Sequence, residues 1–269
     1  MRISRPMVLA ACAAALTLPL TACGGDSEQN PADALAAAVA AVSQKSSAEV
    51  EVVTEDPEDG KTLGEGRTSW KAGSEGTDLV MRKPGDPEWV KTAGADGETR
   101  LMVGKDALYM EMDASQLNGK KWLKLGGEES APDEPGSLPT YGPEVLIAAL
   151  STAGDLKKAG SEQIAGQDTD HYTGTVDVAK LAKAKLEGIS AKDRDDWVAE
   201  QKDGGIKKVT LDVWIGDDDL AVRTVKSART AKGAMKETTD ITGYGDGFAL
   251  EVPPAAETAT LEELMRAGQ

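Results

Sequence analysis

Few residues of the chain have the types and spacing that catalysis or metal binding requires. His171 is the only histidine, so a single chain cannot supply the paired histidine ligands of common zinc sites. A Ser–His–Asp triad would have to use His171, which lies beside Tyr172 in a strand-like segment and is better explained as a sheet residue. The Gly-x-Ser-x-Gly motif of hydrolases and the Gly-x-x-x-x-Gly-Lys-Ser/Thr phosphate-binding motif do not occur in the sequence. We therefore expect no catalytic residue and no enzymatic activity.

The acidic runs are weak candidates for a cation site. Asp217, Asp218 and Asp219 are adjacent, whereas a calcium-binding loop spaces its ligands and ends with a distant Glu. A hairpin turn explains this run better. The acids at residues 193–196 suit the start of a helix, where negative charge interacts favourably with the helix dipole. The sequence thus predicts neither a metal nor a cofactor.

The first 22 residues have the organisation of a secretory signal. Arg2 and Arg5 precede an apolar run over residues 7–20, and small residues then lead to Cys23. A positive start, an apolar run of roughly 7–15 residues and a small-residue cleavage site are typical of a signal peptide. The run is also shorter than the about 20 residues that cross a bilayer as a helix. We expect residues 1–22 to be a signal peptide.

Leu20-Thr21-Ala22-Cys23 resembles the lipobox of bacterial lipoproteins. The resemblance implies a diacylglycerol on the Cys23 thiol and cleavage that leaves Cys23 as the first residue of the mature chain. Residues 23–30 would then be a polar, flexible tether. The mature protein is expected to be extracytoplasmic, anchored by lipid at the outer face of the cytoplasmic membrane. The alternative is an ordinary secreted protein in which Cys23 merely lies near the cleavage point.

Composition limits the partners and the fold of the mature chain. Loss of residues 1–22 would leave 28 basic and 46 acidic residues, a net charge of −18. This charge argues against nucleic-acid binding and against broad contact with anionic headgroups. Cys12 would leave with the signal peptide and Cys23 would carry lipid, so the fold has no disulfide and depends on its hydrophobic core. Residues 31–269 are enough for one domain with such a core.

The first element after the tether is a predicted helix over residues 31–42. Asn30 is a suitable N-cap and Pro31 suits the first helical position. Leu35 and Val39 share one apolar face.

Short alternating segments follow, with glycine-rich turns between them. Apolar residues spaced by two predict half-buried strands, and the regular turns suit an antiparallel meander. The pairs and triplets that show this spacing are Val50 and Val52, Leu79 and Met81, Leu101 and Val103, and Leu108, Met110 and Met112.

The second half of the chain mixes helices with strands. An acidic, Pro/Gly-rich loop at residues 126–139 precedes a helix from about Gly142, and residues 177–202 are helical in pattern with a break near Gly188. Residues 209–215 alternate strictly and return through an acidic turn. An apolar sheet face of this length must be covered. We therefore predict an α+β fold, a large curved antiparallel sheet (a half-open β-barrel) whose helices cover or plug the concave face.

Several segments, in their order along the chain, carry a family resemblance. They are the lipobox ending at Cys23, the helix at residues 31–42, Lys121-Trp122-Leu123-Lys124-Leu125, the helix around Pro143 with residues 153–156 after it, residues 164–174, and Leu211-Asp212-Val213-Trp214-Ile215 with its acidic turn and Arg223. In these segments the chain resembles the actinobacterial envelope lipoproteins of the LppX/LprG type, which share the half-open barrel of the LolA/LolB carriers. The resemblance implies a carrier that encloses an acyl chain or an acylated glycolipid. It implies no specific site residue beyond Cys23.

Two hypotheses of function follow. The first is a carrier or binder of a lipid or other hydrophobic ligand, whose candidate cavity lining is Val52, Leu79, Met81, Leu101, Met110, Met112, Leu211 and Val213. The same residues would equally form a filled core. The second is an envelope interaction protein that binds a protein partner through the loop at residues 126–139 and the helical insertion at residues 177–202.

Overall fold

The computed structural model describes residues 30–73, 75–104, 107–126 and 141–267. The predicted signal peptide and the lipidation site at Cys23 lie outside the described residues, as does most of the predicted loop at residues 126–139. Within the described ranges, every helix is too short or too polar to cross a membrane.

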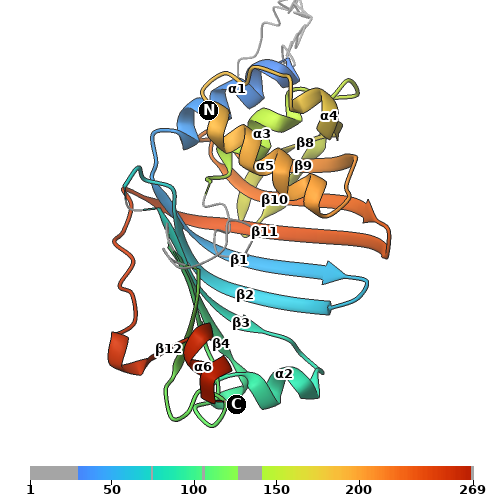
Figure 1. Cartoon of the computed structure of the whole chain (residues 1–269). Coiled ribbons are helices and arrows are strands. Elements are labelled where there is room, and N and C mark those ends of the chain that lie inside the picture. The colour runs from blue at the N-terminus through green and yellow to red at the C-terminus, as the bar shows by residue number, and fades with distance from the viewer. Residues whose placement is uncertain (1–29, 74, 105–106, 127–140, 268–269) are drawn as a thin grey trace, which may run out of the picture.

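One sheet of twelve strands organises the molecule (Figure 1). Its strand order is β12-β6-β5-β4-β3-β2-β1-β11-β10-β9-β8-β7, so β12 and β7 are the two edges and the sheet does not close. All pairs are antiparallel except β12 with β6, which is parallel. The strands are β1 (Ser47–Asp56), β2 (Gly60–Ser69), β3 (Gly76–Arg82), β4 (Thr99–Gly104), β5 (Leu108–Glu111), β6 (Trp122–Leu125), β7 (Lys157–Ile164), β8 (Gln167–Asp177), β9 (Lys208–Gly216), β10 (Ala221–Thr230), β11 (Gly233–Gly245) and β12 (Thr258–Thr260).

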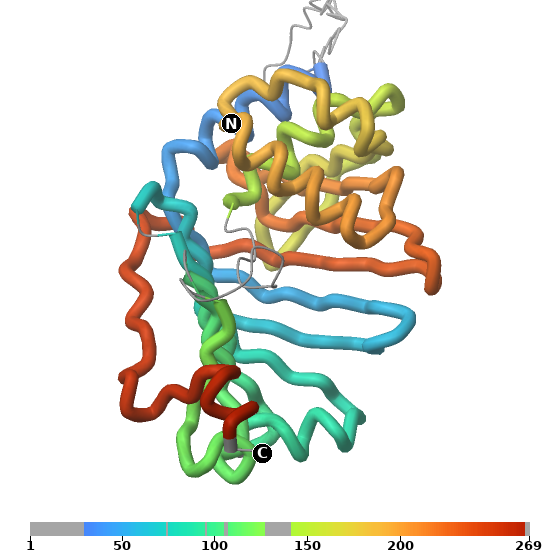
Figure 2. Tube along the Cα trace, in the orientation of Figure 1, coloured from blue at the N-terminus to red at the C-terminus, as the bar shows by residue number. Residues whose placement is uncertain are grey.

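The helices gather at two ends of this sheet. Helices α1 (Pro31–Val42), α3 (Glu144–Leu150), α4 (Val178–Leu181) and α5 (Ala191–Asp203) lie together over β8 to β10 (Figure 1). Figure 2 shows α6 (Leu261–Ala267) and α2 (Pro87–Thr92) at the opposite end from α1. Two short 3-10 turns span Ala95–Gly97 and Ala255–Glu257.

Local sequence signals explain the ends of the helices. The Asn30 side chain accepts a hydrogen bond from the Ala32 N–H, and Pro31 occupies the first turn of α1 as predicted. The Ser190 hydroxyl accepts from the Asp193 N–H and starts α5, so the predicted break near Gly188 separates two helices. These helices begin where the sequence places a cap.

The main hydrophobic core lies between the four clustered helices and the strands beneath them. Leu35 of α1, Leu150 of α3 and Trp197 of α5 are fully buried there. They pack in one cluster with Leu211 and other inward residues of β8 and β9. No described residue of β2 to β6 belongs to this cluster. The predicted α+β architecture is confirmed, and its helices cover one part of the sheet.

Candidate functional site

The two faces of the sheet can be assigned from strand register. Ile241 of β11 packs in the helix-covered core and pairs with Val50 of β1. Because side chains alternate along a strand, Val50 and Val52 share the helix-covered face, while Glu49 and Glu51 lie on the opposite face. We name the helix-covered face the inner face and the opposite one the outer face.

An uninterrupted apolar row crosses the inner face. The register places one residue from each of seven strands opposite the next, and none of these side chains is polar. Seven strands at about 4.8 Å spacing give the row a length of about 29 Å. We name this set the apolar row: Ile241, Val50, Gly66, Leu79, Leu101, Met110 and Leu123.

The far part of the apolar row is not buried in the core. Leu79, Leu101, Met110 and Leu123 are each half-buried, although they stand on interior strands of a twelve-stranded sheet. By contrast, Leu211 and Val213 on β9 are 0% exposed beneath the helices. Apolar side chains on the strands that the helices do not cover thus keep accessible surface.

The eight predicted lining residues therefore fall into two groups. Val52, Leu79, Met81, Leu101 and Met110 share the inner face of β1, β3, β4 and β5 through their register, and all five are half-buried. Met112 is also half-buried but lies just beyond the end of β5, where its N–H bonds to the Lys121 carbonyl. Leu211 and Val213 belong to the filled core. Whether any of the eight contacts a ligand stays a prediction.

A polar row parallels the apolar row on the same face. Lys226 of β10, Glu237 of β11, Thr54 of β1 and Thr62 of β2 lie opposite one another in register. The Lys226 side chain is only 8% exposed, and its Nζ lies 2.9 Å from Glu200 Oε1 and 3.5 Å from Glu237 Oε1. We name these four residues the polar row; Glu200 reaches them from α5.

Attraction between opposite charges keeps Lys226 and Glu200 ionised although both are largely buried. Burial alone would lower the pKa of Lys226, but Glu237 and Glu200 outweigh it and the pKa is raised. Burial alone would raise the pKa of Glu200, but Lys226 and the hydroxyl that Tyr141 donates to it bring a net decrease. Burial also raises the pKa of Tyr141, so its hydroxyl stays a donor. Sequence reasoning missed this cluster; an inward Lys226 in the alternating pattern of β10 was its only signal.

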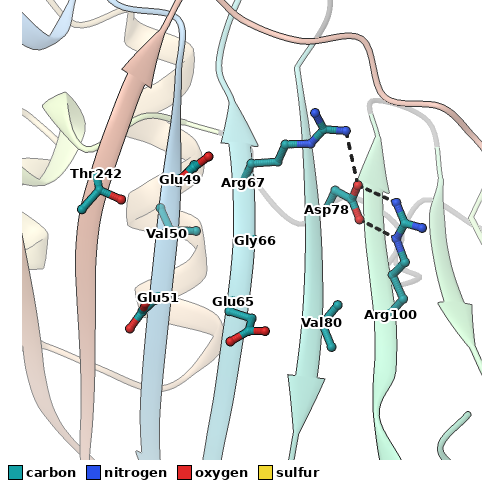
Figure 3. Close-up of a pocket in the computed structure, with 10 residues that line it drawn as sticks. All are labelled: Glu49, Val50, Glu51, Glu65, Gly66, Arg67, Asp78, Val80, Arg100 and Thr242. Carbon is teal, nitrogen blue, oxygen red and sulfur yellow. Dashed lines mark hydrogen bonds and ion pairs between the residues drawn. The ribbon is translucent and has the colours of Figure 1, made fainter. Parts of the chain in front are cut away.

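The outer face carries a polar hollow of roughly 510 Å³ (Figure 3). Arg100 donates two hydrogen bonds of 2.8 Å to Asp78, and Arg67 lies 3.6 Å from the same carboxylate. The Arg100 hydrogen bond holds the pKa of Asp78 below its usual value. The Arg67 guanidinium also stacks 4.1 Å from the Phe248 ring centroid. These paired charges join neighbouring strands, and most of the residues that line the hollow are charged or polar.

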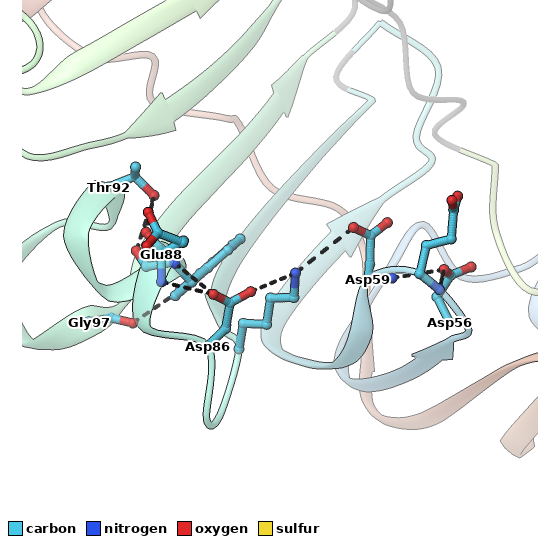
Figure 4. Close-up of polar contacts among 9 residues, drawn as sticks. Asp56, Asp59, Asp86, Glu88, Thr92 and Gly97 are labelled. Atoms are coloured by element: carbon cyan, nitrogen blue, oxygen red, sulfur yellow. Dashed lines mark hydrogen bonds and ion pairs between the residues drawn. The ribbon is translucent and has the colours of Figure 1, made fainter.

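Polar contacts also fix the β1–β2 hairpin tip to the start of α2 (Figure 4). Lys83 lies 2.9 Å from Asp86 and 3.9 Å from Asp59 of the hairpin. Asp86 caps α2 by accepting from the Glu88 and Trp89 N–H groups at 2.9 and 3.1 Å. This network is structural.

The residues that suggested catalysis or cation binding occupy structural positions. His171 is in β8, as predicted, with Nε2 2.8 Å from Asp212 Oδ1 and its ring stacked 4.1 Å from Trp214. The predicted turn at Asp217, Asp218 and Asp219 connects β9 to β10. In the described part of the chain, no group of three or more His, Cys, Asp or Glu side chains could hold a metal ion.

Two Streptomyces proteins are similar in sequence to this chain over most of its length. No protein-family model matches the chain. It is 29% identical over 248 residues to an uncharacterized 31.2 kDa protein of Streptomyces griseus, covering 86% of this chain and 81% of the relative. It is 26% identical over 254 residues to a Streptomyces coelicolor protein named as a candidate lipoprotein, covering 87% and 76%.

Among solved structures, the Mycobacterium tuberculosis lipoprotein LppX aligns with 82% of this chain and 98% of its own, at 15% identity and a TM-score of 0.50. The agreement shows a common fold, and the resemblance seen in the sequence is confirmed.

Proposed function

From the LppX/LprG-type, LolA-like fold of this chain, we propose that it is a membrane-anchored extracytoplasmic lipoprotein that binds a lipid or other hydrophobic ligand. The ligand lies on the inner face of the sheet, and the lipid on Cys23 keeps the protein at the outer face of the cytoplasmic membrane. Two similar proteins support this proposal, because LppX and the Streptomyces coelicolor relative are both named as lipoproteins.

The observation that carries the proposal is the half-buried part of the apolar row. Leu79, Leu101 and Met110 face inward on adjacent strands and are neither exposed like surface residues nor sealed like Leu211. Burying about twelve methylenes of an acyl chain there would release about 10 kcal/mol, at ~0.8 kcal/mol per methylene. Ordering the ligand offsets part of this gain, and the remainder is enough for stable binding.

Binding without chemistry fits the residues present. The single histidine is held by Asp212 and Trp214 on the outer face of β8, away from the apolar row. A binder needs shape and apolar area and requires neither a nucleophile nor a metal.

The test is native mass spectrometry of protein expressed from the full chain with Cys23→Ser, purified without detergent. We expect a stoichiometric mass excess that organic solvent extracts as lipid. Met110→Glu places a charge in the apolar row and should abolish uptake, whereas Tyr109→Glu, on the other face of the same strand, should retain it. A clean apo mass, with no uptake when envelope lipids are offered, would favour the protein-partner alternative instead.

A further inference from the structure

The inner face is graded from apolar to polar along its strands. On β1, Val50 belongs to the apolar row and Thr54 to the polar row, four residues or about 13 Å further along. Between them lies a mixed row in which Thr239, Val52, Gly64 and Met81 are opposite one another. A molecule that covers both ends of this gradient must itself be amphipathic.

Glu237 is the member of the polar row that can bind a further group. Both carboxylate oxygens of Glu200 are engaged, one by Lys226 and the other by the Tyr141 hydroxyl. Glu237 contacts Lys226 through one oxygen, Oε1, which lies 3.5 Å from the Lys226 Nζ, and the Glu237 side chain is 30% exposed. In the part of the chain that the structure describes, its second oxygen accepts no hydrogen bond. Glu237 is therefore held in place and still able to accept from a ligand.

The charge of the cluster selects among polar groups. Two carboxylates face one ammonium, so the site has an excess negative charge in a partly desolvated place. A phosphate would meet like charge, which costs more where solvent is scarce. Thr54 lies beside Glu237 and Thr62 lies beside Thr54, and both add hydroxyls that can donate and accept. Such a set matches hydroxyl groups better than anions.

We propose that the polar row recognises an uncharged, hydroxyl-bearing headgroup of an amphipathic ligand whose hydrocarbon part lies on the apolar row. Glu237 accepts a hydrogen bond from a headgroup hydroxyl, while Lys226 positions Glu237 and Glu200. This inference rests on the proposed function and adds the class of ligand and the residue that discriminates against anionic lipids.

The test compares lipids that share a C18 monounsaturated chain and differ at its polar end. Monooleoylglycerol, its phosphate monoester and oleylamine, each below its aggregation concentration, are titrated into protein expressed from the full chain with Cys23→Ser, and bound fractions are read by native mass spectrometry. We expect monooleoylglycerol to bind at least tenfold more tightly than the phosphate monoester. Glu237→Gln should reduce that preference at least threefold by admitting the anion. Glu51→Gln, the same charge change on the outer face of β1, should leave the preference unchanged.

Each outcome separates the two proposals. Equal binding of the neutral lipid and its phosphate would overturn the headgroup proposal and leave the proposed function standing. Tightest binding of oleylamine would show attraction of cations and overturn the uncharged headgroup. Absence of binding by all three lipids would overturn both. If Glu237→Gln fails to fold, Thr54→Val provides the second test: it should weaken monooleoylglycerol binding, and an unchanged affinity would count against the polar row.

Discussion

Replacing Lys226 with methionine tests the buried charge cluster most sharply. Lys226→Met keeps an unbranched apolar chain but leaves Glu200 and Glu237 facing each other without their shared cation. Removing one partner of a fully buried pair costs about 3–5 kcal/mol. Because the Glu200 and Glu237 side chains are 36% and 30% exposed, water offsets part of that penalty. We expect a loss of about 2–3 kcal/mol in the free energy of unfolding at pH 8.

The loss should depend on pH with a definite sign. The pKa of Glu200 is lowered in the folded protein, so this pairing stabilises above the usual carboxyl pKa and is lost as pH falls through the lowered value. The pKa of Lys226 is raised, so its contribution is complete below the usual lysine pKa and is lost only as pH rises through the raised value. In Lys226→Met the Glu200 carboxylate lacks its cation and protonates at higher pH. The penalty should therefore shrink between pH 8 and pH 5.

Urea unfolding followed by circular dichroism at both pH values measures this penalty. Lys236→Met is the matched control, because Lys236 is the exposed neighbour of Glu237 on β11 and its loss should stay within about 0.5 kcal/mol. A Lys226→Met penalty equal to that of the control, or unchanged between pH 8 and pH 5, would show that Lys226 does not stabilise the buried charge cluster.

Three further predictions test other parts of the structure. Leu211→Ala, in the filled core, should cost about 3 kcal/mol, whereas Leu79→Ala, on the half-buried row, should cost less than half as much in urea unfolding; equal losses would contradict the division of the inner face. Burial raises the pKa of Glu144 to about 7. Ionising this residue is therefore harder in the folded protein, and the free energy of unfolding should fall by roughly 3 kcal/mol as pH rises from 4.5 to 7. Glu144→Gln should flatten that decline, and an unchanged dependence of the free energy of unfolding on pH would exclude Glu144 as its cause. Asp86→Ala removes the cap of α2 and should cost about 1 kcal/mol; an unchanged unfolding midpoint would show that the cap is dispensable.

Much of the fold could be predicted because its local signals agree with its tertiary structure. The Asn30 cap, the Ser190 cap and the alternation over residues 209–215 each specify an element that the structure contains. Strand β2 was not predicted, since Gly64 and Gly66 interrupt its pattern with residues that weaken strands. There Gly66 has a φ of 155° and a Cβ would lie 2.1 Å from the Asp78 carbonyl oxygen, so close strand approach requires glycine.

The candidate site could be predicted only in part, because alternation reveals which residues share a face and not what covers that face. Leu79 and Leu211 lie in similar alternating patterns, yet the helices bury Leu211 completely and leave Leu79 half-buried. The polar row was missed for a related reason. Lys226 lies 26 residues from Glu200 and pairs with it only after α5 folds over β10, and spacing along the chain carries no sign of that contact.

Lipid uptake by a pair of neighbouring variants shows which face of the sheet holds the ligand. Leu79 and Val80 are adjacent on β3, both half-buried, with Leu79 on the inner face and Val80 on the outer face. Monooleoylglycerol binding is measured by native mass spectrometry for Leu79→Asp and Val80→Asp, each with its fold verified by circular dichroism. We expect Leu79→Asp to weaken binding at least tenfold, whereas Val80→Asp should bind like the parent. Equal binding by the two folded variants would show that the ligand does not lie on the inner face.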